Sequence, residues 1–355
     1  MIKTYTYKLK PNKSIEFKFN EWIGICRFVY NCSKDLKEQN YQKGIKLSKF
    51  DISNQLPEAK KEFTWLKQVH SQTLQAVVER LDDSYQKFFK GGGYPKWATK
   101  KKWKSIPFKS IKTTHNAFNL PSFGIVKVFK FKQPKGKLKT ATLIKEADGI
   151  FLKIVVEEYI DIKTSENQAI CGIDMGIKYF LTTSDSEFVD NPKHLFSYLK
   201  ELRIENRSLT RMKKGGNNYK KQINKLQRLH LKIKRVRLDF LHKQSAKLAK
   251  QYNIIIREDL NIKGMSKNSN LSKYILDCSW GTFFTFLEYK TKVIKVNPKY
   301  TSQECSKCGH TCKENRKTQS LFECVNCKYI ENADLQACFN ILQRGQSLLE
   351  INVSR

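Results

Sequence analysis

Four cysteines near the C-terminus constrain the fold of this chain more than any other feature. They form two Cys-x-x-Cys pairs separated by 15 residues: Cys305, Cys308, Cys324 and Cys327. This spacing is typical of a zinc ribbon, in which four thiolates surround one tetrahedral Zn²⁺. Such a shell leaves no open position for a reacting water, so the zinc is expected to stabilise the local backbone. Any catalytic groups must therefore lie elsewhere.

The charge balance points to a polyanionic partner. The 355 residues include 67 Lys and Arg against 33 Asp and Glu, a formal net charge of +34. Solubility alone needs only about 2 to 8 units in a small domain, and a larger excess opposes a compact fold unless a polyanion neutralises it. We expect nucleic acid to be that partner. No segment approaches the roughly 18 apolar residues of a spanning helix, so no membrane partner is expected and the protein is placed in the cytoplasm.

The order of predicted elements indicates a multi-domain α+β protein. A short N-terminal strand is followed by amphipathic helices up to about residue 90, and strand-like segments then occupy residues 116–160. The polar stretch 164–168 reads as a linker. Beyond it, a pair of strands turns at Gly176, and residues 196–252 form two long basic helices interrupted at Gly215 and Gly216.

Two basic segments are candidates for contact with nucleic acid. One interleaves lysines with aromatic rings that can stack on bases, although an ordinary loop whose aromatics fill a core fits the pattern equally well. The other is a helix whose charges are nearly all positive, which favours phosphate contact over a merely solvated face. The candidates are Trp97, Lys100, Lys101, Lys102 and Trp103 in the loop and Lys225, Arg228, Lys232 and Arg235 in the helix.

Three acids lie where a strand or a helix would hold them rigidly. Asp174 lies in the first strand of the pair, Glu258 ends the strand NIIIRE, and Asp334 opens the helix ADLQACFNIL. Singly, each has a structural explanation: Asp334 as a helix N-cap, Glu258 in a turn and Asp174 in a hairpin hydrogen bond. Together, in a basic protein, they reproduce the layout of an RNase H-like nuclease. Such a cluster would bind two Mg²⁺ or Mn²⁺ ions and hydrolyse phosphodiesters.

Ordered motifs over nearly the whole chain resemble the TnpB (OrfB) family of insertion-sequence proteins, relatives of type V CRISPR effectors. The matching segments are CRFVYNCS, EFTWLKQVHSQTLQ, GYPKWATKKK, GIDMGIKYFLTTSD, RLHLKIKRVRLDFLHKQS, IIREDLNIKGM, YTSQECSKCG and DLQACFNI. The resemblance implies a transposon-encoded DNA endonuclease in which a guide RNA pairs with double-stranded target DNA while the protein holds the backbone. It maps the RuvC catalytic triad onto Asp174, Glu258 and Asp334, and the zinc ligands onto the four cysteines.

The resemblance also implies a domain plan, but leaves monomer or homodimer undetermined. The expected domains are a β-barrel (1–10 and 105–163), a helical recognition lobe (11–104) and a RuvC-like nuclease domain (168–355) with a zinc-ribbon insertion (301–330). Gln336, Cys338 and Lys328 depart from the family's usual Asn, Ala and Gly. The first two departures are expected to affect hydrogen bonding around the metal site, and the third to reshape the zinc site. The alternative functions are a guide-bound DNA-binding repressor without cleavage and an accessory transposase.

Overall fold

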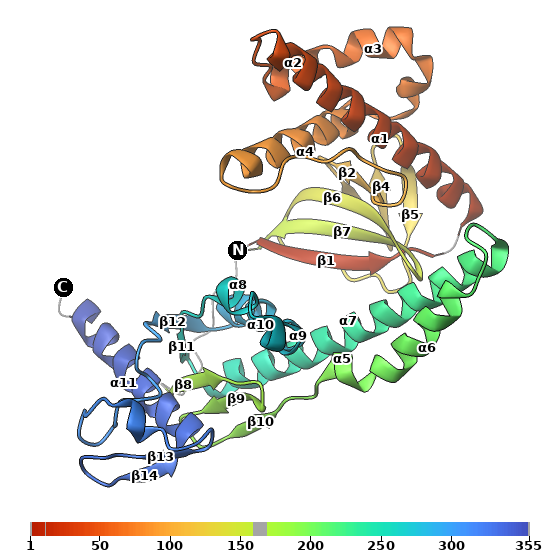
Figure 1. The fold of residues 1–355 in the computed structure, drawn as a ribbon. Helices are drawn as coiled ribbons and strands as arrows, with labels where there is room; N and C mark the ends of the chain where they lie inside the picture. Colours follow the sequence, from red (N-terminus) through yellow and green to blue (C-terminus); the bar gives the residue numbers. More distant parts are fainter. Residues whose placement is uncertain (1, 11, 159–168, 354–355) are drawn as a thin grey trace. The chain divides into compact units, whose positions relative to one another are not determined.

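The computed structural model describes residues 2–10, 12–158 and 169–353. The chain divides into two compact units, Met1–Ile160 and Asp161–Arg355 (Figure 1). The linker predicted at 164–168 and the domain boundaries predicted at 163 and 168 lie outside the described residues. Within the described parts of the chain, no helix has both the length and the apolar run that crossing a membrane requires.

Two long helices dominate the first unit. α1 (Lys13–Gln42) begins at Asn12, whose side chain accepts hydrogen bonds from the backbone N–H groups of Ser14 and Ile15. α1 packs against α4 (Ser71–Phe89), the helix expected from its apolar periodicity. Three short elements connect them: α2 (Lys49–Asn54), α3 (Leu56–Glu62) and the 3₁₀ helix η1 (Thr64–Gln68).

The strands of the first unit form two antiparallel sheets. One has the order β1-β7-β6-β2 and the other the order β3-β4-β5, and an isolated bridge joins Leu9 to Val128. The strands are β1 (Ile2–Lys8), β2 (Ser105–Phe108), β3 (Lys112–Thr114), β4 (Ala117–Leu120), β5 (Gly124–Lys127), β6 (Lys137–Glu146) and β7 (Gly149–Glu157). Trp22 of α1 packs on Phe108 of β2, so helices and strands share one core. A separate lobe over 11–104 and a closed barrel stay predictions.

A five-stranded mixed sheet organises the second unit. The order is β10 (Phe188–Asp190), β9 (Tyr179–Thr183), β8 (Ile170–Met175), β11 (Ile254–Glu258) and β12 (Lys292–Val296). β8, β11 and β12 run parallel, whereas β9 and β10 are antiparallel to their neighbours. With the four-cysteine cluster in the same unit, the predicted mixed α+β class is confirmed at this level.

Helices cover both faces of this sheet. Successive strand residues alternate between faces, so Cys171, Ile173 and Ile255 join one core with α7 (Asn217–Gln251), α9 (Ser269–Cys278) and α10 (Trp280–Glu288). The other face, with Ile254 and Ile256, packs on α11 (Ala333–Val353). Figure 1 shows α11, at the blue end of the colour scale, beside β8 and β11.

Shorter helices complete the second unit. α5 (His194–Ser197) and α6 (Leu199–Thr210) precede α7, and α6 packs along α7 as a helical hairpin. α7 begins after Gly216, as the sequence predicted. α8 (Ile262–Met265) follows β11. The zinc-ribbon region contains η2 (Lys313–Asn315) and the antiparallel pair β13 (Leu321–Glu323) and β14 (Ile330–Asn332).

Candidate metal centres

Asp174 and Glu258 lie side by side at the carboxyl ends of two parallel strands. In the β8–β11 pair, Ile173 is opposite Arg257, so the next residues, Asp174 and Glu258, are neighbours. Alternation along each strand places both on the face that packs against α11. Both side chains are partly buried. Adjacent parallel strands therefore present two carboxylates on the same face of the sheet.

Helix α11 brings Asp334 to the same place. A Cβ atom on Gly172 would lie 2.5 Å from the carbonyl oxygen of Cys338, so glycine is required where the helix backbone touches β8. Asp174 lies two residues beyond Gly172 on β8, a rise of about 6.6 Å along the strand. Asp334 lies four residues before Cys338 on α11, a rise of about 6 Å along the helix axis. The helix N-cap is Asn332, whose Oδ1 accepts from the N–H of Asp334 at 2.9 Å, so the N-cap explanation of Asp334 is wrong.

The charges of Glu258 and Asp334 both act on Asp174, which places all three carboxylates at this end of the sheet. Burial, followed by the charges of Glu258 and Asp334, raises the pKa of Asp174 from 3.8 to about 8. Burial also raises the pKa of Glu258, against the opposing effect of a hydrogen bond donated by the Thr301 hydroxyl. Two acids that lie 84 and 160 residues further along the sequence thus repel the charged form of Asp174, and we call the three residues the carboxylate cluster. Their catalytic role stays a prediction.

Arg316 is a member of this cluster that the sequence analysis missed. Its guanidinium lies 3.4 Å from the Asp334 carboxylate, and it also lowers the pKa of Asp174. The neighbouring residue, Asn315, is fully buried: its amide donates to the carbonyls of Gln303 and His310 and accepts from the N–H of Val325. The zinc-ribbon region therefore fixes the position of Arg316. The sequence places three basic residues, Lys313, Arg316 and Lys317, between the two cysteine pairs and does not distinguish Arg316 from the two lysines.

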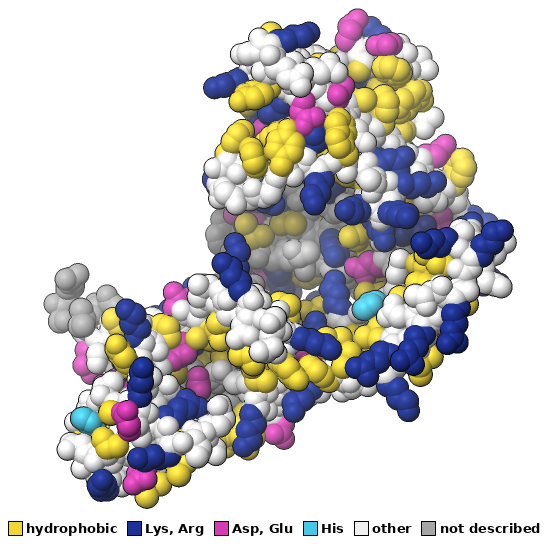
Figure 2. Space-filling view, in the orientation of Figure 1, with side chains coloured by type: hydrophobic (Ala, Val, Ile, Leu, Met, Phe, Trp, Pro, Cys, Tyr) yellow, Lys and Arg dark blue, Asp and Glu magenta, His cyan; other side chains and the backbone are white. Residues whose placement is uncertain are grey.

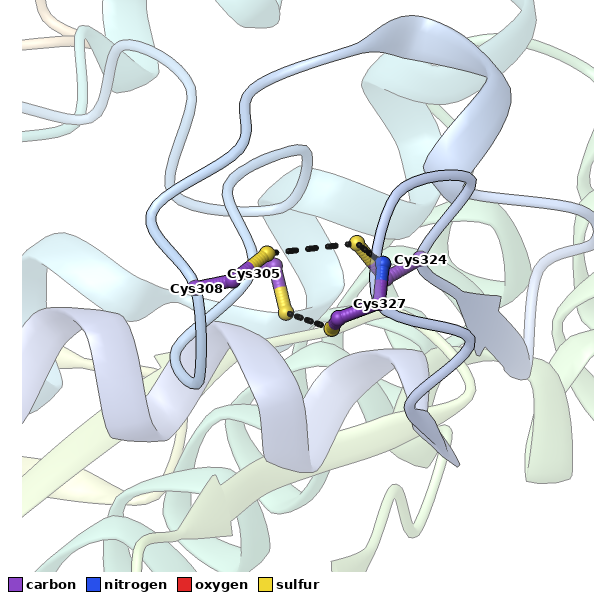
Figure 3. A group of neighbouring side chains, drawn as sticks. All are labelled: Cys305, Cys308, Cys324 and Cys327. Atoms are coloured by element: carbon purple, nitrogen blue, oxygen red, sulfur yellow. Dashed lines mark hydrogen bonds between the residues drawn. The ribbon is translucent and has the colours of Figure 1, made fainter.

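The four cysteines form a compact metal site (Figure 3). Among the described residues, they are the group of metal-binding side chains whose ligand atoms all lie within 4.8 Å of one another. The Sγ atoms of Cys305 and Cys327 are 3.6 Å apart, as are those of Cys308 and Cys324. Zn–S bonds of about 2.3 Å in a tetrahedron require about 3.8 Å between sulfurs, so the geometry suits zinc. The N–H of His310 helps to lower the pKa of the Cys308 thiol to about 6, which favours the metal-binding thiolate.

Two amide side chains of α11, the helix that carries Asp334, form hydrogen bonds to the zinc ribbon. Gln336 is fully buried; its amide donates to the carbonyl of Glu304 and accepts from the Ser306 hydroxyl. Asn340 donates to the carbonyls of Thr301 and Glu304. Gln336, one of the departures from the family pattern, therefore contacts the ribbon. Cys338 packs under the sheet and donates to the carbonyl of Thr182.

The backbone conformation of Lys328 explains why glycine is usual at this position. It follows Cys327 with φ +60°, as Gly309 follows Cys308 with φ +71°. A left-handed conformation costs a non-glycine residue about 1–2 kcal/mol. We expect Lys328→Gly to stabilise the zinc-loaded protein by about 1 kcal/mol, measured by thermal unfolding. The reciprocal change, Gly309→Lys, should destabilise it by a similar amount; equal stability of both variants would contradict this explanation.

The residues predicted to contact nucleic acid differ in their exposure and in their contacts with other side chains. Trp97 is 48% exposed, whereas Trp103 packs on Tyr30 and is partly buried, so of these two rings only that of Trp97 is exposed. Lys100, Lys101 and Lys102 are exposed. On α7 all four predicted residues are exposed, but Lys225 is paired with Glu205 at 2.7 Å and Lys232 lies over the Tyr198 ring. Figure 2 shows Lys and Arg gathered along α6 and α7.

Three family models match consecutive parts of the chain. A helix-turn-helix domain model of the OrfB IS605 group matches residues 1–46, where the structure has β1 and the single long helix α1. A model of the same group described as "Probable transposase" matches residues 153–269. The Cas12f1-like TNB domain model matches residues 280–341, which include all four cysteines and Asp334.

Relatives match over almost their full lengths. The "Putative RNA-guided DNA endonuclease InsQ" of Escherichia coli (strain K12) is 30% identical over 98% of this chain and 93% of its own. A "Putative RNA-guided DNA endonuclease" of Streptomyces pristinaespiralis is 27% identical over 97% and 89%. The solved structure of the mini-RNA-guided endonuclease CRISPR-Cas phi3 covers 97% of this chain and 92% of that one, with 11% identity and a TM-score of 0.49. The chain belongs to the TnpB (OrfB) family of insertion-sequence proteins, which is related to the type V CRISPR effectors.

Proposed function

We propose that this protein is an RNA-guided, divalent-metal-dependent DNA endonuclease whose second unit is a RuvC-like nuclease domain. The observations that carry the proposal are the neighbouring positions of Asp174 and Glu258 on two parallel strands and the effect of the Asp334 charge on Asp174, in a protein of net charge +34. The names of its relatives from Escherichia coli and Streptomyces pristinaespiralis support the same activity.

The carboxylate cluster suits two hard cations. Oxygen ligands are those that Mg²⁺ and Mn²⁺ prefer, and the raised pKa of Asp174 marks a site where added positive charge would relieve repulsion. Asp174, Glu258 and Asp334 would hold the ions. Ions held by these carboxylates would supply activation of the attacking water and stabilisation of the leaving oxygen.

Neighbouring residues would orient this site. The Thr301 hydroxyl, which donates to Glu258 Oε1 and lies within reach of the carbonyl of Pro298, would fix the direction of the Glu258 carboxylate. Arg316 holds Asp334 and carries a fork of N–H donors suited to a phosphate. Its position at the carboxylates favours contact with the DNA strand that is being cleaved.

RNA and DNA partners follow from the charge distribution. The exposed lysines and arginines of α7 and the Lys100–Lys102 segment would hold phosphates, while base pairing between guide and target would supply sequence specificity. In the first unit, the two antiparallel sheets would serve as the wedge-like barrel and α1–α4 as the recognition lobe. The four-cysteine site would hold a structural Zn²⁺.

A plasmid-library experiment tests the proposal. The protein is purified with RNA expressed from its own flanking sequence, and is challenged with plasmids that carry the target next to randomised positions. Depletion of plasmids with one short flanking motif, in the presence of Mg²⁺, is expected. Tight target binding without cleavage in any divalent ion would favour the repressor, and joined DNA strands would favour a transposase.

The raised pKa of Asp174 predicts how the metal-free protein responds to pH. A carboxyl group with a raised folded-state pKa stabilises the fold below pH 3.8, and this contribution is lost as pH rises through about 8. We expect Asp174→Asn to be more stable than wild type in metal-free buffer, by a margin that grows by about 1 kcal/mol per pH unit between pH 5 and 8. Thermal unfolding across this range measures it. Mg²⁺ should stabilise wild type selectively; a margin independent of pH would contradict the prediction.

A further inference from the structure

An aromatic cavity opens between the two long helices of the first unit. Its volume is about 470 Å³. The walls come from α1 (Lys37, Glu38, Tyr41 and Gln42), from α4 (Tyr85, Phe88 and Phe89) and from the following loop (Tyr94). Tyr41 and Phe89 are each 70% exposed, which is unusual for large rings that could have packed in the core. An exposed group of large apolar side chains with a polar rim is typical of a binding site.

Tyr94 and Glu38 form the polar edge of this aromatic cavity. The Tyr94 hydroxyl donates to Glu38 Oε1 at 2.6 Å, and the buried Lys34 ammonium donates to the same oxygen. Burial acts to raise the pKa of Glu38, but these two bonds outweigh it and lower the pKa, so the carboxylate is ionised. Its second oxygen, Oε2, makes no hydrogen bond among the described residues and is free to accept one.

The rings are held in place before any ligand binds. Tyr94 packs edge-on against Tyr85 and Phe88, at ring-centroid distances of 5.8 and 5.2 Å. Two hydrogen bonds between the Asn31 amide and the backbone of Ala98 tie the loop to α1. At Gly92 a Cβ would lie 2.7 Å from the carbonyl of Lys87, so the chain can turn here only with glycine. A rigid aromatic wall loses little entropy on binding a flat ligand.

The second hollow beside Tyr94 extends this surface. It measures about 440 Å³ and is lined by Lys34, Glu38, Tyr94, Pro95, Lys96 and Trp97. The Lys34 ammonium lies 4.2 Å from the Trp97 ring centroid, so one buried cation supports both Trp97 and Glu38. Glu38 and Asp82 are each paired with a lysine, while Lys87, Lys90 and Lys96 are exposed. The surroundings therefore attract a polyanion and the interior attracts a flat ring.

We propose that the aromatic cavity binds one unpaired nucleobase of the RNA that the protein carries, with Glu38 accepting a hydrogen bond from the base. The inference rests on the proposed function for the presence of that RNA. Single-stranded RNA is recognised by splaying out bases, stacking them on aromatic side chains and reading their polar edges. An ionised carboxylate accepts from the amino groups of cytosine, adenine or guanine. Uracil has no amino group, and its one donor on this edge, the N3–H, lies between two carbonyls that the carboxylate repels, so amino-bearing bases are preferred.

The test compares exposed aromatic residues inside and outside the aromatic cavity. Phe89→Ala and Tyr94→Ala should weaken binding of the purified protein to the RNA with which it is co-expressed by about 5- to 50-fold, because each base–aromatic stack contributes that much. Phe50→Ala is the matched control: Phe50 is 68% exposed on α2 and lines neither hollow. Equal affinities of Phe89→Ala and Phe50→Ala would overturn the inference.

A second measurement identifies the base and its source. Ultraviolet crosslinking of the complex with RNA and target DNA, followed by mass spectrometry, should place an RNA nucleotide on peptides that contain Tyr41, Phe89 or Tyr94. A DNA nucleotide at these positions would overturn the assignment to RNA. With short homopolymers as probes, wild type should prefer oligo(C) or oligo(A) to oligo(U), and Glu38→Gln should reduce this preference. RNA binding and DNA cleavage are measured separately. If the wild-type protein cleaves its target and the cavity variants bind RNA normally, this inference is wrong while the proposed function stands.

Discussion

Asp174→Ala is expected to lower target DNA cleavage by about 10³-fold or more while leaving binding of RNA and target DNA within about twofold of wild type. Asp174 is the neighbour of Glu258 across the β8–β11 pair, and the charges of both Glu258 and Asp334 act on its carboxyl group. Loss of about 4 kcal/mol of transition-state stabilisation corresponds to 10³-fold in rate. Cleavage is measured as single-turnover rates on a plasmid target in Mg²⁺, and binding by filter retention.

Asp190→Ala is the matched control for this prediction. Asp190 is an exposed acid on β10, an edge strand of the same sheet. The Asp190→Ala variant should cleave target DNA at the wild-type rate. Glu258→Gln and Asp334→Asn should behave as Asp174→Ala does. If Asp174→Ala retained more than a tenth of the wild-type rate, the carboxylate cluster would not be the catalytic site. If wild type bound its target but never cleaved it, the repressor function would be favoured.

The three acids could be found in the sequence because each belongs to a regular element. The alternation of NIIIRE places Glu258 on the face of Ile254 and Ile256, and this is the face that packs on α11. The structure adds what periodicity cannot give: the parallel pairing of β8 with β11, which makes Asp174 and Glu258 neighbours. That pairing joins residues more than 80 positions apart, and local pattern carries no signal for it.

Residues whose role depends on packing could not be predicted. Trp97 and Trp103 share one basic aromatic segment, yet only the packing of Trp103 on Tyr30 distinguishes a core ring from an exposed one. Lys34 reads as a surface lysine of an amphipathic helix but is 2% exposed beneath Trp97. Arg316 lies in an irregular loop whose path is set by Asn315 and the cysteines. In each case the information lies in contacts between distant segments.

Loss of one zinc ligand should have the largest effect on stability. Cys324 is fully buried, so Cys324→Ser is expected to abolish zinc binding and to unfold the ribbon, because structural zinc contributes about 10–16 kcal/mol in small zinc domains. The metal content should fall from one zinc per chain to none. DNA cleavage should fall by about 10²-fold or more, since Asn315 then loses its contacts within the ribbon and Arg316 loses its position at Asp334.

Cys312→Ser is the matched control, because it removes a thiol of the ribbon that is not one of the four predicted zinc ligands. Cys312 lies in the same ribbon, half-buried, but outside the four-cysteine group. This variant should retain one zinc per chain and the wild-type cleavage rate. Because Gln336 and Asn340 hold the ribbon against the helix that carries Asp334, unfolding the ribbon removes contacts from one side of the carboxylate cluster. Full cleavage by zinc-free Cys324→Ser would show instead that the carboxylates are positioned by the sheet and α11 alone.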